Sequence, residues 1–480
     1  MSIYKKLSVS LLFLVVIFFS FFRLTVSPPI NFDEGLFVQT ASNLAAHGID
    51  GLQMAPGYIV SLGRYITVGF PLIYPLAVLF KIIGAGFLQA RLLMVVFIFG
   101  FAAVGYSLMR KLYGDAIALA ALAVSATFPP LYGNGKSING EVEGIFFLAL
   151  SLLCYALTRT QPSRKAFWLI MSGISIGLCV AAKPFFAVVI PALLVGVYIE
   201  WRRGVLSPKD ILVASVSTVV PIAVWFIAEF RPGDSLGVTL SFYANNADLG
   251  DFKSVIIGNM RTLFSNFSTL CTLLFIAVWA CAIFLKIRLK AVVTFEEIVA
   301  FTFSALLIVA FLFTTGFFRY IFPAQIIALL FCSSSFLFIF HAASKKVAIL
   351  KGYLAYGAVI AAIAIAGIYQ LSFHSYVADN YSNQKDEALQ NYFGSLPDST
   401  KIFFLNTPEI VPFFHGNDYY QEVMIFDNSV WGEGSLPIIT NGDADLVVIG
   451  DHPAKYDIPG LFDKYVKATS FAKYTILQRR

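Results

Sequence analysis

The chain has 480 residues, of which 58% are hydrophobic and 13% are charged, and its formal net charge is +6. Soluble domains carry about 25% charged residues, so this composition excludes a soluble globular protein. Several separate apolar runs of about 20 residues each predict a polytopic membrane protein whose spans are helical.

The charge is divided unevenly along the chain. Residues 373–480 hold 14 acidic and 8 basic side chains, a net charge of −6, so the first 372 residues carry +12. Because those basic residues are distributed among the loops between apolar runs, they indicate membrane topology rather than nucleic-acid binding. We therefore expect membrane lipids, and no nucleic acid, among the partners.

The first apolar run, residues 7–26, follows Lys5 and Lys6. It lacks an A-x-A cleavage pattern and further spans follow, which favours an uncleaved anchor over a cleaved signal peptide. The two lysines predict a cytoplasmic N-terminus, so that residues 27–65 form a long external loop.

Two helices are predicted in and just after this loop. The apolar spacing of residues 34–47 suits a helix that lies on the membrane surface. Residues 66–84 are apolar but interrupted by Pro71 and Pro75, which favours an interfacial or re-entrant helix over a full span. If residues 66–84 crossed the membrane, every later basic loop would change sides.

With the first run, the pattern predicts eleven spans. The ten later ones are residues 88–109, 116–133, 143–158, 166–182, 184–200, 211–229, 262–285, 296–316, 318–342 and 352–371. Every loop that this topology assigns to the cytoplasm is basic, as the positive-inside rule requires. We therefore divide the chain into a membrane domain, residues 1–372, and an extracytoplasmic domain, residues 373–480.

The tail beyond residue 372 has no long apolar run. Its strand-like segments 401–406, 445–449 and 474–478 predict a small soluble α/β domain. The five cysteines all lie in apolar runs, so we expect neither a disulfide framework nor a thiolate metal site.

Asp33 and Glu34 stand just outside the first span, at the start of a predicted helix. A carboxylate that faces a cavity there can act as a general base toward an acceptor hydroxyl. The alternative is a structural role, in which Asp33 caps the helix and Glu34 is favoured by the helix dipole.

A second acidic pair, Glu141 and Glu143, lies at the external mouth of a predicted span, with Lys136 nearby. Acidic groups at a membrane boundary are candidates for function, and the alternative is solvation at the interface. Glu141 precedes the apolar run, so we favour it over Glu143.

Cations are predicted at the same external boundary. Lys183 and Arg319 could bind a lipid phosphate, and Tyr320 adjoins Arg319; the alternative is that both cations extend toward the headgroups. Arg64 and Arg91 are weaker candidates on the same side.

Such a site suits a substrate with a lipid tail, a phosphate and a polar head, because the acids can activate a nucleophile and the cations can neutralise a departing phosphate. The five histidines show no metal-ligand spacing, and no nucleotide-binding motif occurs. We expect no cofactor; a divalent cation between Asp33 and Glu141 is conceivable but not favoured, since Lys and Arg can neutralise a phosphate without it.

The sequence resembles the GT-C class of membrane glycosyltransferases that use isoprenyl-phosphate sugars. This class includes protein O-mannosyltransferases, lipid A aminoarabinose transferases and lipopolysaccharide galacturonosyl transferases. The motifs that carry the resemblance are Asp33-Glu34 in NFDEGLFVQTASNL, FPLIYPLAVLFKIIG followed by the Leu88–Leu92 segment, Glu141 in INGEVEGIFFLAL, AAKPFFAVVIPALL around Lys183, and Arg319-Tyr320. They cover residues 7–330, and many relatives carry Asp where this chain has Glu141.

The resemblance implies a helical membrane bundle with two juxtamembrane helices in the first external loop. It implies inverting transfer of a sugar from a polyprenyl phosphate to an acceptor outside the cytoplasmic membrane. Asp33 would be the general base, Glu34 would support it and Glu141 would position a substrate, while Lys183 and Arg319 would bind phosphate.

Two other functions stay open from the sequence. A transporter or flippase of lipid-linked sugars should show inverted repeats or charges at mid-span, neither of which we find. A ligase or polymerase of lipid-linked oligosaccharides would share the donor chemistry. Neither the sugar nor the isoprenoid is specified, and lipopolysaccharide, another cell-envelope polymer, a glycolipid and a periplasmic protein all remain open as acceptors.

Overall fold

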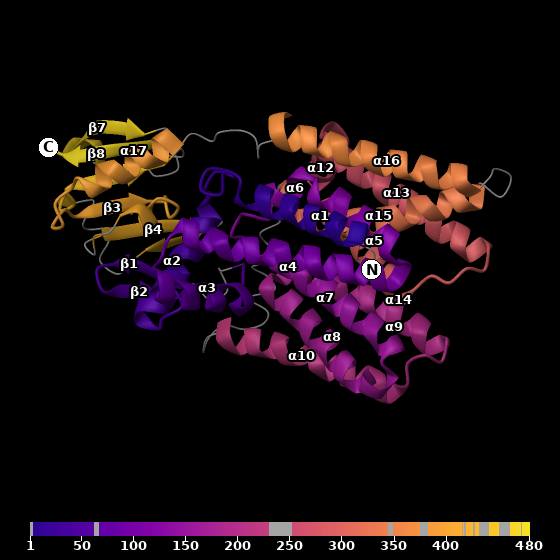
Figure 1. Cartoon of the computed structure of the whole chain (residues 1–480). Helices are drawn as coiled ribbons and strands as arrows, with labels where there is room; N and C mark the ends of the chain where they lie inside the picture. The colour runs from indigo at the N-terminus through magenta and orange to yellow at the C-terminus, as the bar shows by residue number, and fades with distance from the viewer. Residues whose placement is uncertain are drawn as a thin grey trace.

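The computed structural model describes residues 3–61, 67–229, 252–343, 349–374, 383–414, 416, 419–425, 428–431, 441–450, 461–471 and 473–480. A bundle of helices forms most of the molecule, and a sheet domain lies at one end of it (Figure 1). We call this the domain end of the bundle, and the opposite end, where the N-terminus lies, the far end.

The bundle is built mainly from long apolar helices. Within the described residues, nine helical segments are long and apolar enough to cross a membrane. They comprise α1 (Ile3–Phe21), α4 (Phe87–Tyr113), α7 (Glu141–Thr160), α8 (Lys165–Ala182) with the preceding turn η2 (Pro162–Arg164), α9 (Val189–Arg202) with the preceding turn η3 (Pro184–Val188), α10 (Pro208–Glu229), α13 (Phe267–Arg288), α15 (Phe322–Ala343) and α16 (Ile349–Tyr369) with the following turn η6 (Gln370–His374). The expected multi-pass helical bundle is therefore confirmed.

Two of the eleven predicted spans are shorter than expected. The segment 116–133 forms α5 (Asp115–Ala126) and the separate turn α6 (Pro129–Gly133). At about 1.5 Å per residue, α5 is only about 18 Å long, and the prolines after Phe128 start a new turn rather than extend it. The segment 296–316 forms α14 (Phe295–Phe311), whose first turn carries two glutamates.

Close backbone approach helps to hold the bundle together. Gly173 and Gly177 of α8 face α10. A Cβ atom on Gly173 would lie 2.5 Å from Ala214 O, and one on Gly177 would lie 2.4 Å from Thr218 O. Small residues spaced by four let membrane helices pack at short range. A further helix, α12 (Phe252–Ser265), precedes α13.

Both helices predicted around the first external loop are present. The loop contains α2 (Phe32–His47) and the hairpin of β1 (Leu52–Ala55) and β2 (Tyr58–Val60), and α3 (Phe70–Ile83) follows it. At about 21 Å, α3 is too short to span a bilayer. The expectation that α2 lies on the membrane surface is wrong in one respect: residues 34–41 are all buried, because the bundle covers one side of α2 and the sheet domain covers the other.

The sheet domain is a mixed six-stranded sheet with strand order β5-β4-β3-β6-β8-β7. Its elements are α17 (Asn383–Gly394), β3 (Ile402–Leu405), η7 (Val411–Phe413), β4 (Tyr419–Ile425), β5 (Asn428–Trp431), β6 (Leu446–Ile449), α19 (Leu461–Lys464), β7 (Tyr465–Phe471) and β8 (Tyr474–Arg479). Strands β4, β3 and β6 are parallel. The three strand-like segments of the tail correspond to β3, β6 and β8, which confirms the small α/β domain.

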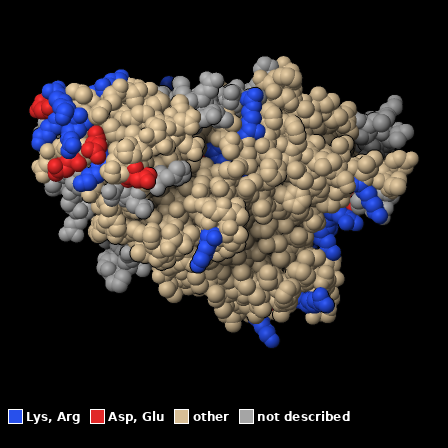
Figure 2. All heavy atoms as spheres, turned by 60° about the vertical axis from the view of Figure 1, so that its left-hand side comes forward, with Lys and Arg blue, Asp and Glu red and all other residues tan. Residues whose placement is uncertain are grey.

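The central strands of this sheet are buried on both faces. Phe404 and Val448 pack with Phe393 of α17 on one face, whereas Phe403 and Val447 pack on the other. Side chains alternate between the faces of a strand, so the continuous apolar runs of β3 and β6 supply both cores. In Figure 2, charged side chains of both signs gather on the sheet domain, whereas the bundle surface is mostly uncharged.

Candidate active site

The first turn of α2 is fixed by a reciprocal cap. The Asn31 side chain accepts a hydrogen bond from the Glu34 amide at 3.1 Å, and Glu34 Oε2 accepts one from the Asn31 amide at 3.1 Å. This capping box satisfies two amides that the helix itself leaves unpaired. It also determines that Asp33 lies in the first turn of α2, at the domain end of the bundle.

Glu34 is completely buried in an ion pair with Arg91 of α4. Arg91 Nη2 donates to both carboxylate oxygens at 3.2 Å, and the Ile138 amide donates to Oε1 at 3.2 Å. Arg91 Nη1 also donates to Leu24 O at 2.9 Å. Both side chains are thus enclosed and hydrogen-bonded, which favours a structural role for each over the predicted catalytic role of Glu34 and phosphate-binding role of Arg91.

Asp33 pairs instead with Arg319, 286 residues further along the chain. Arg319 lies in η4 (Phe318–Tyr320), the turn that precedes α15. The two side chains are 25% and 24% exposed, and the Arg319 Nε atom has no hydrogen-bond partner within the described residues. The pair is therefore partly exposed, and within that part of the chain one buried donor of the guanidinium group is left without a partner.

Glu141 forms a second pair, with Lys183, and both are buried. Lys183 Nζ lies 2.6 Å from Glu141 Oε1 and donates to Asn139 O at 2.6 Å. Glu141 is the first residue of α7, after Gly140 in a left-handed conformation (φ 83°), where a Cβ atom would meet Ala182 O at 3.0 Å. Pro184 ends α8 just after Lys183, and the close approach at Gly140 brings Lys183 beside α7.

The two pairs act on each other electrostatically. Burial lowers the pKa of Lys183, which lies in the link between two spans; Glu141 and Asp33 oppose this effect and Arg319 adds to it. Burial would also lower the pKa of Arg319, but Asp33 and Glu141 raise it above its ordinary value. We call these four residues the domain-end cluster; its two acids and two cations balance one another.

Of the remaining predicted residues, Tyr320 and Glu143 lie beside this cluster. The Tyr320 ring packs against Phe185, with centroids 6.1 Å apart. Glu143 is fully buried, and neither of its carboxylate oxygens has a hydrogen-bond partner in the described part of the chain. Arg64 lies outside the described residues.

Lys136, which the sequence marked only as a neighbour of the acids, lies close enough to Arg91 to interact with it electrostatically. It is fully buried, and its Nζ atom donates to Phe22 O at 2.9 Å. Burial and then the nearby charge of Arg91 lower the pKa of Lys136 to about 7. The sequence around Lys136 could not indicate this environment, because its neighbours are Phe22, which follows α1, and Arg91 of α4.

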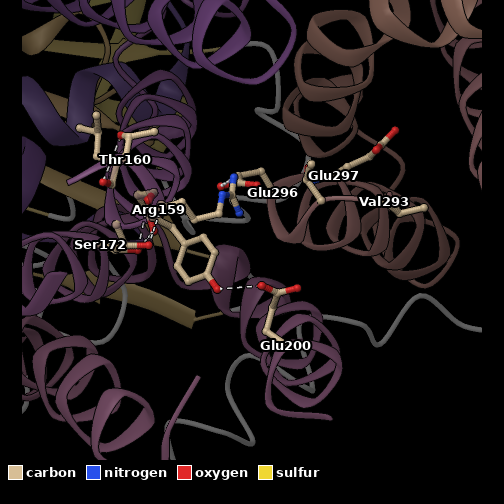
Figure 3. Close-up of polar contacts among 12 residues, drawn as sticks. Arg159, Thr160, Ser172, Glu200, Val293, Glu296 and Glu297 are labelled. Carbon is tan, nitrogen blue, oxygen red and sulfur yellow. Dashed lines mark hydrogen bonds and ion pairs between the residues drawn. The ribbon is translucent and has the colours of Figure 1, made fainter. Parts of the chain in front are cut away.

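A second polar cluster lies at the far end of the bundle, and the sequence analysis did not anticipate it (Figure 3). We call it the far-end cluster. It consists of three acid–cation pairs: Arg159–Glu296 at 2.6 Å, Arg203–Glu200 at 3.0 Å and Lys286–Glu297 at 2.7 Å. The three glutamates are at most 6% exposed. Two of the pairs connect helices, α7 to α14 and α13 to α14. The Arg203–Glu200 pair lies within the end of α9, which is connected to α7 by a hydrogen bond from the Tyr155 hydroxyl to Glu200 at 3.3 Å.

Neither cluster has the donor set of a metal centre. No group of three or more His, Cys, Asp or Glu side chains that could hold a metal ion occurs among the residues that the structure describes. In the domain-end cluster each carboxylate is already paired with a cation.

Comparison with known proteins relates this geometry to one class of fold. Residues 70–227 match the family model described as dolichyl-phosphate-mannose-protein mannosyltransferase. No curated protein sequence matches the chain.

Solved structures match over nearly the whole chain. ArnT from Cupriavidus metallidurans bound to undecaprenyl phosphate is similar with a TM-score of 0.60 at 11% identity, covering 99% of this chain and 97% of that one. The apo oligosaccharyltransferase of Archaeoglobus fulgidus has a TM-score of 0.60 at 14% identity, covering 94% of this chain and 71% of that one. Another structure of the same archaeal protein, AglB, is in complex with an inhibitory peptide and a dolichol-phosphate, with a TM-score of 0.56 at 13% identity and coverage of 100% and 75%. The chain has the GT-C fold, as the sequence resemblance implied.

Proposed function

We propose that the chain is an inverting glycosyltransferase. It moves a sugar from a polyprenyl phosphate, of the undecaprenyl or dolichyl type, to a hydroxyl group of a lipid, glycan or protein acceptor. The reaction takes place at the outer face of the cytoplasmic membrane, since the basic loops predict that the far end of the bundle is cytoplasmic.

One observation carries this proposal: two acid–cation pairs meet at the domain end of a GT-C bundle, and one of them is partly exposed. A donor phosphate can compete with Asp33 for Arg319, because a guanidinium group forms strong hydrogen bonds with phosphates as well as with carboxylates. Donor binding would then free the Asp33 carboxylate next to the sugar.

The freed carboxylate acts as a general base. Asp33 takes the proton of the acceptor hydroxyl while the hydroxyl oxygen bonds to the anomeric carbon from the face opposite the phosphate. The bond between the anomeric carbon and the phosphate oxygen breaks, and its electron pair leaves with the polyprenyl phosphate. Arg319 and Lys183 neutralise that charge, and Glu141 keeps Lys183 in place and orients a substrate.

No step of this reaction needs a cofactor. One structure of the archaeal oligosaccharyltransferase is described as a complex with zinc and sulfate. In this chain Asp33 and Glu141 are neutralised by Arg319 and Lys183, so two cationic side chains supply the positive charge that a metal ion would bring.

A transporter of lipid-linked sugars is less well supported. Alternating access would require the far end to open, and two ion pairs with buried carboxylates connect α7, α13 and α14 there. Removing one partner of such a pair typically costs about 3–5 kcal/mol. The far-end cluster therefore suits a bundle that stays closed on that side.

The test is to add the purified protein to membrane lipids extracted from cells that lack it, and to follow isoprenyl phosphates by mass spectrometry. A transferase consumes one polyprenyl-phosphate sugar and releases the free polyprenyl phosphate when acceptor is present. If every lipid-linked sugar stays chemically intact, the transferase proposal fails and transport becomes the better account.

A further inference from the structure

The sheet domain contacts the first external loop through α2. Gln39 Nε2 donates to Pro408 O at 2.7 Å, and Gln421 Nε2 donates to Gln39 Oε1 at 2.9 Å and to Gln53 O at 2.5 Å. Gln421 belongs to β4, Gln39 to α2 and Gln53 to β1. One glutamine of the sheet domain thus holds both the helix and the hairpin of the first external loop.

A glycine permits the closest approach. A Cβ atom on Gly35 would lie 2.3 Å from Glu409 Cα, 2.4 Å from Glu409 N and 2.5 Å from Pro408 C. All three atoms belong to the backbone, so a larger residue would push residues 408–409 away from α2. Gly35 follows Asp33 by two residues, and this contact therefore reaches the first turn that carries the proposed base.

Residues 408–409 are in turn fixed to the sheet. Glu409 Oε1 accepts a hydrogen bond from the Tyr474 hydroxyl at 2.8 Å and pairs with Lys473 Nζ at 2.8 Å. Tyr474 begins β8. A continuous set of contacts leads from β8 through Glu409 to Gly35, and from β4 through Gln421 to Gln39.

The contact is polar, although it is buried. Gln39, Glu409 and Gln421 are each at most 5% exposed. Each of them makes at least one hydrogen bond, although Gln421 Oε1 and Glu409 Oε2 have no hydrogen-bond partner within the described residues. Hydrogen bonds between buried groups depend on distance and direction, so they specify one arrangement more strictly than apolar packing does. Apolar packing alone would tolerate sliding of α2 against the sheet domain, whereas these bonds set its position along the helix axis.

We propose that the sheet domain is a positioning element of the active site, acting through Gln421 and Gly35 on α2 to hold Asp33 against Arg319. This inference rests on the proposed role of Asp33 as the base. It goes beyond that role by assigning a task to the C-terminal domain.

The test compares Gly35→Ala and Gln421→Leu with the control Gly258→Ala on α12, where no atom lies within 4 Å of the added Cβ. Hydrogen exchange of α2 and α7 is measured in detergent, together with kcat and KM for the donor. We expect exchange in α2 to rise at least about tenfold in both test variants while α7 is unchanged. We also expect kcat to fall at least about tenfold with KM within about twofold, and the control to match the natural protein.

The two readouts separate the inference from the proposed function. Should the natural protein show no transfer, the exchange data still decide whether the sheet domain holds α2. Unchanged exchange in α2 in both variants overturns the inference, and so does a matching rise in α2 and α7, which would make the sheet domain a general folding element. Equal losses in kcat and donor affinity would also contradict a positioning role.

Discussion

The two ends of α7 carry similar residues in different environments. Glu141 at its first residue pairs with Lys183 in the domain-end cluster, and Arg159 in its last turn pairs with Glu296 in the far-end cluster. In the far-end cluster the three glutamates are at most 6% exposed, whereas at the domain end Asp33 and Arg319 are about a quarter exposed. Buried pairs that cannot change partners hold helices, while a pair that is open to solvent can exchange its partner for a substrate.

The largest difference between the ends should appear when a matched lysine is removed from each. Lys183→Met and Lys286→Met both leave a buried glutamate without its cation, so we expect each to destabilise the protein by about 3–5 kcal/mol. Only Lys183→Met should also reduce transfer per folded molecule, by about 100-fold or more. Thermal unfolding and transfer assays on the folded fraction measure both effects; equal loss of transfer in Lys286→Met would remove the distinction between the ends.

Glu34→Gln tests whether the buried Glu34–Arg91 pair, which lies beside the partly exposed Asp33–Arg319 pair, has a structural role only. It leaves Arg91 buried without a counter-charge, and we expect a loss of stability of about 3–5 kcal/mol. Transfer by the folded fraction should stay within about tenfold of the natural protein, because Glu34 only holds the loop. If Glu34→Gln is as stable as the natural protein but does not transfer sugar, Glu34 is a catalytic residue and not a structural one.

Arg319→Gln should weaken donor binding while leaving the fold intact. A charge-assisted hydrogen bond contributes about 1.5–3 kcal/mol, so we expect KM for the donor to rise about 10- to 100-fold. Arg203→Gln at the far end is the matched control and should leave KM unchanged. If both substitutions alter KM alike, the open pair does not bind the donor phosphate.

Lys136 gives an effect of another kind, a dependence of stability on pH. Its folded pKa is about 7 against an ordinary value of 10.5, so between these values the unfolded chain binds more protons and stability rises with pH. The slope that one proton contributes is about 1.4 kcal/mol per pH unit at most. Lys136→Met should remove this slope from thermal unfolding measured between pH 7 and 10; an unaltered slope would assign it to other groups.

Composition and periodicity predicted the bundle, the two helices of the first external region and the strands of the tail, because these depend on local runs of apolar residues. The partners of the charged residues could not be predicted, since Asp33 meets a residue 286 positions away and Glu34 one 57 positions away. The burial of α2 was missed because the sheet domain that covers it is remote in sequence. The far-end glutamates were not singled out, because their partners come from helices that are separate in sequence.

The most direct test of the proposed site is the rate of sugar transfer by Asp33→Asn. The asparagine keeps the shape of the side chain but cannot accept the acceptor's proton, and general-base catalysis contributes about 10²- to 10⁴-fold. We predict a fall in kcat of that size, with normal membrane insertion and unchanged thermal unfolding. Full transfer by Asp33→Asn would contradict the assignment of Asp33 as the base and, with it, the mechanism of the domain-end cluster.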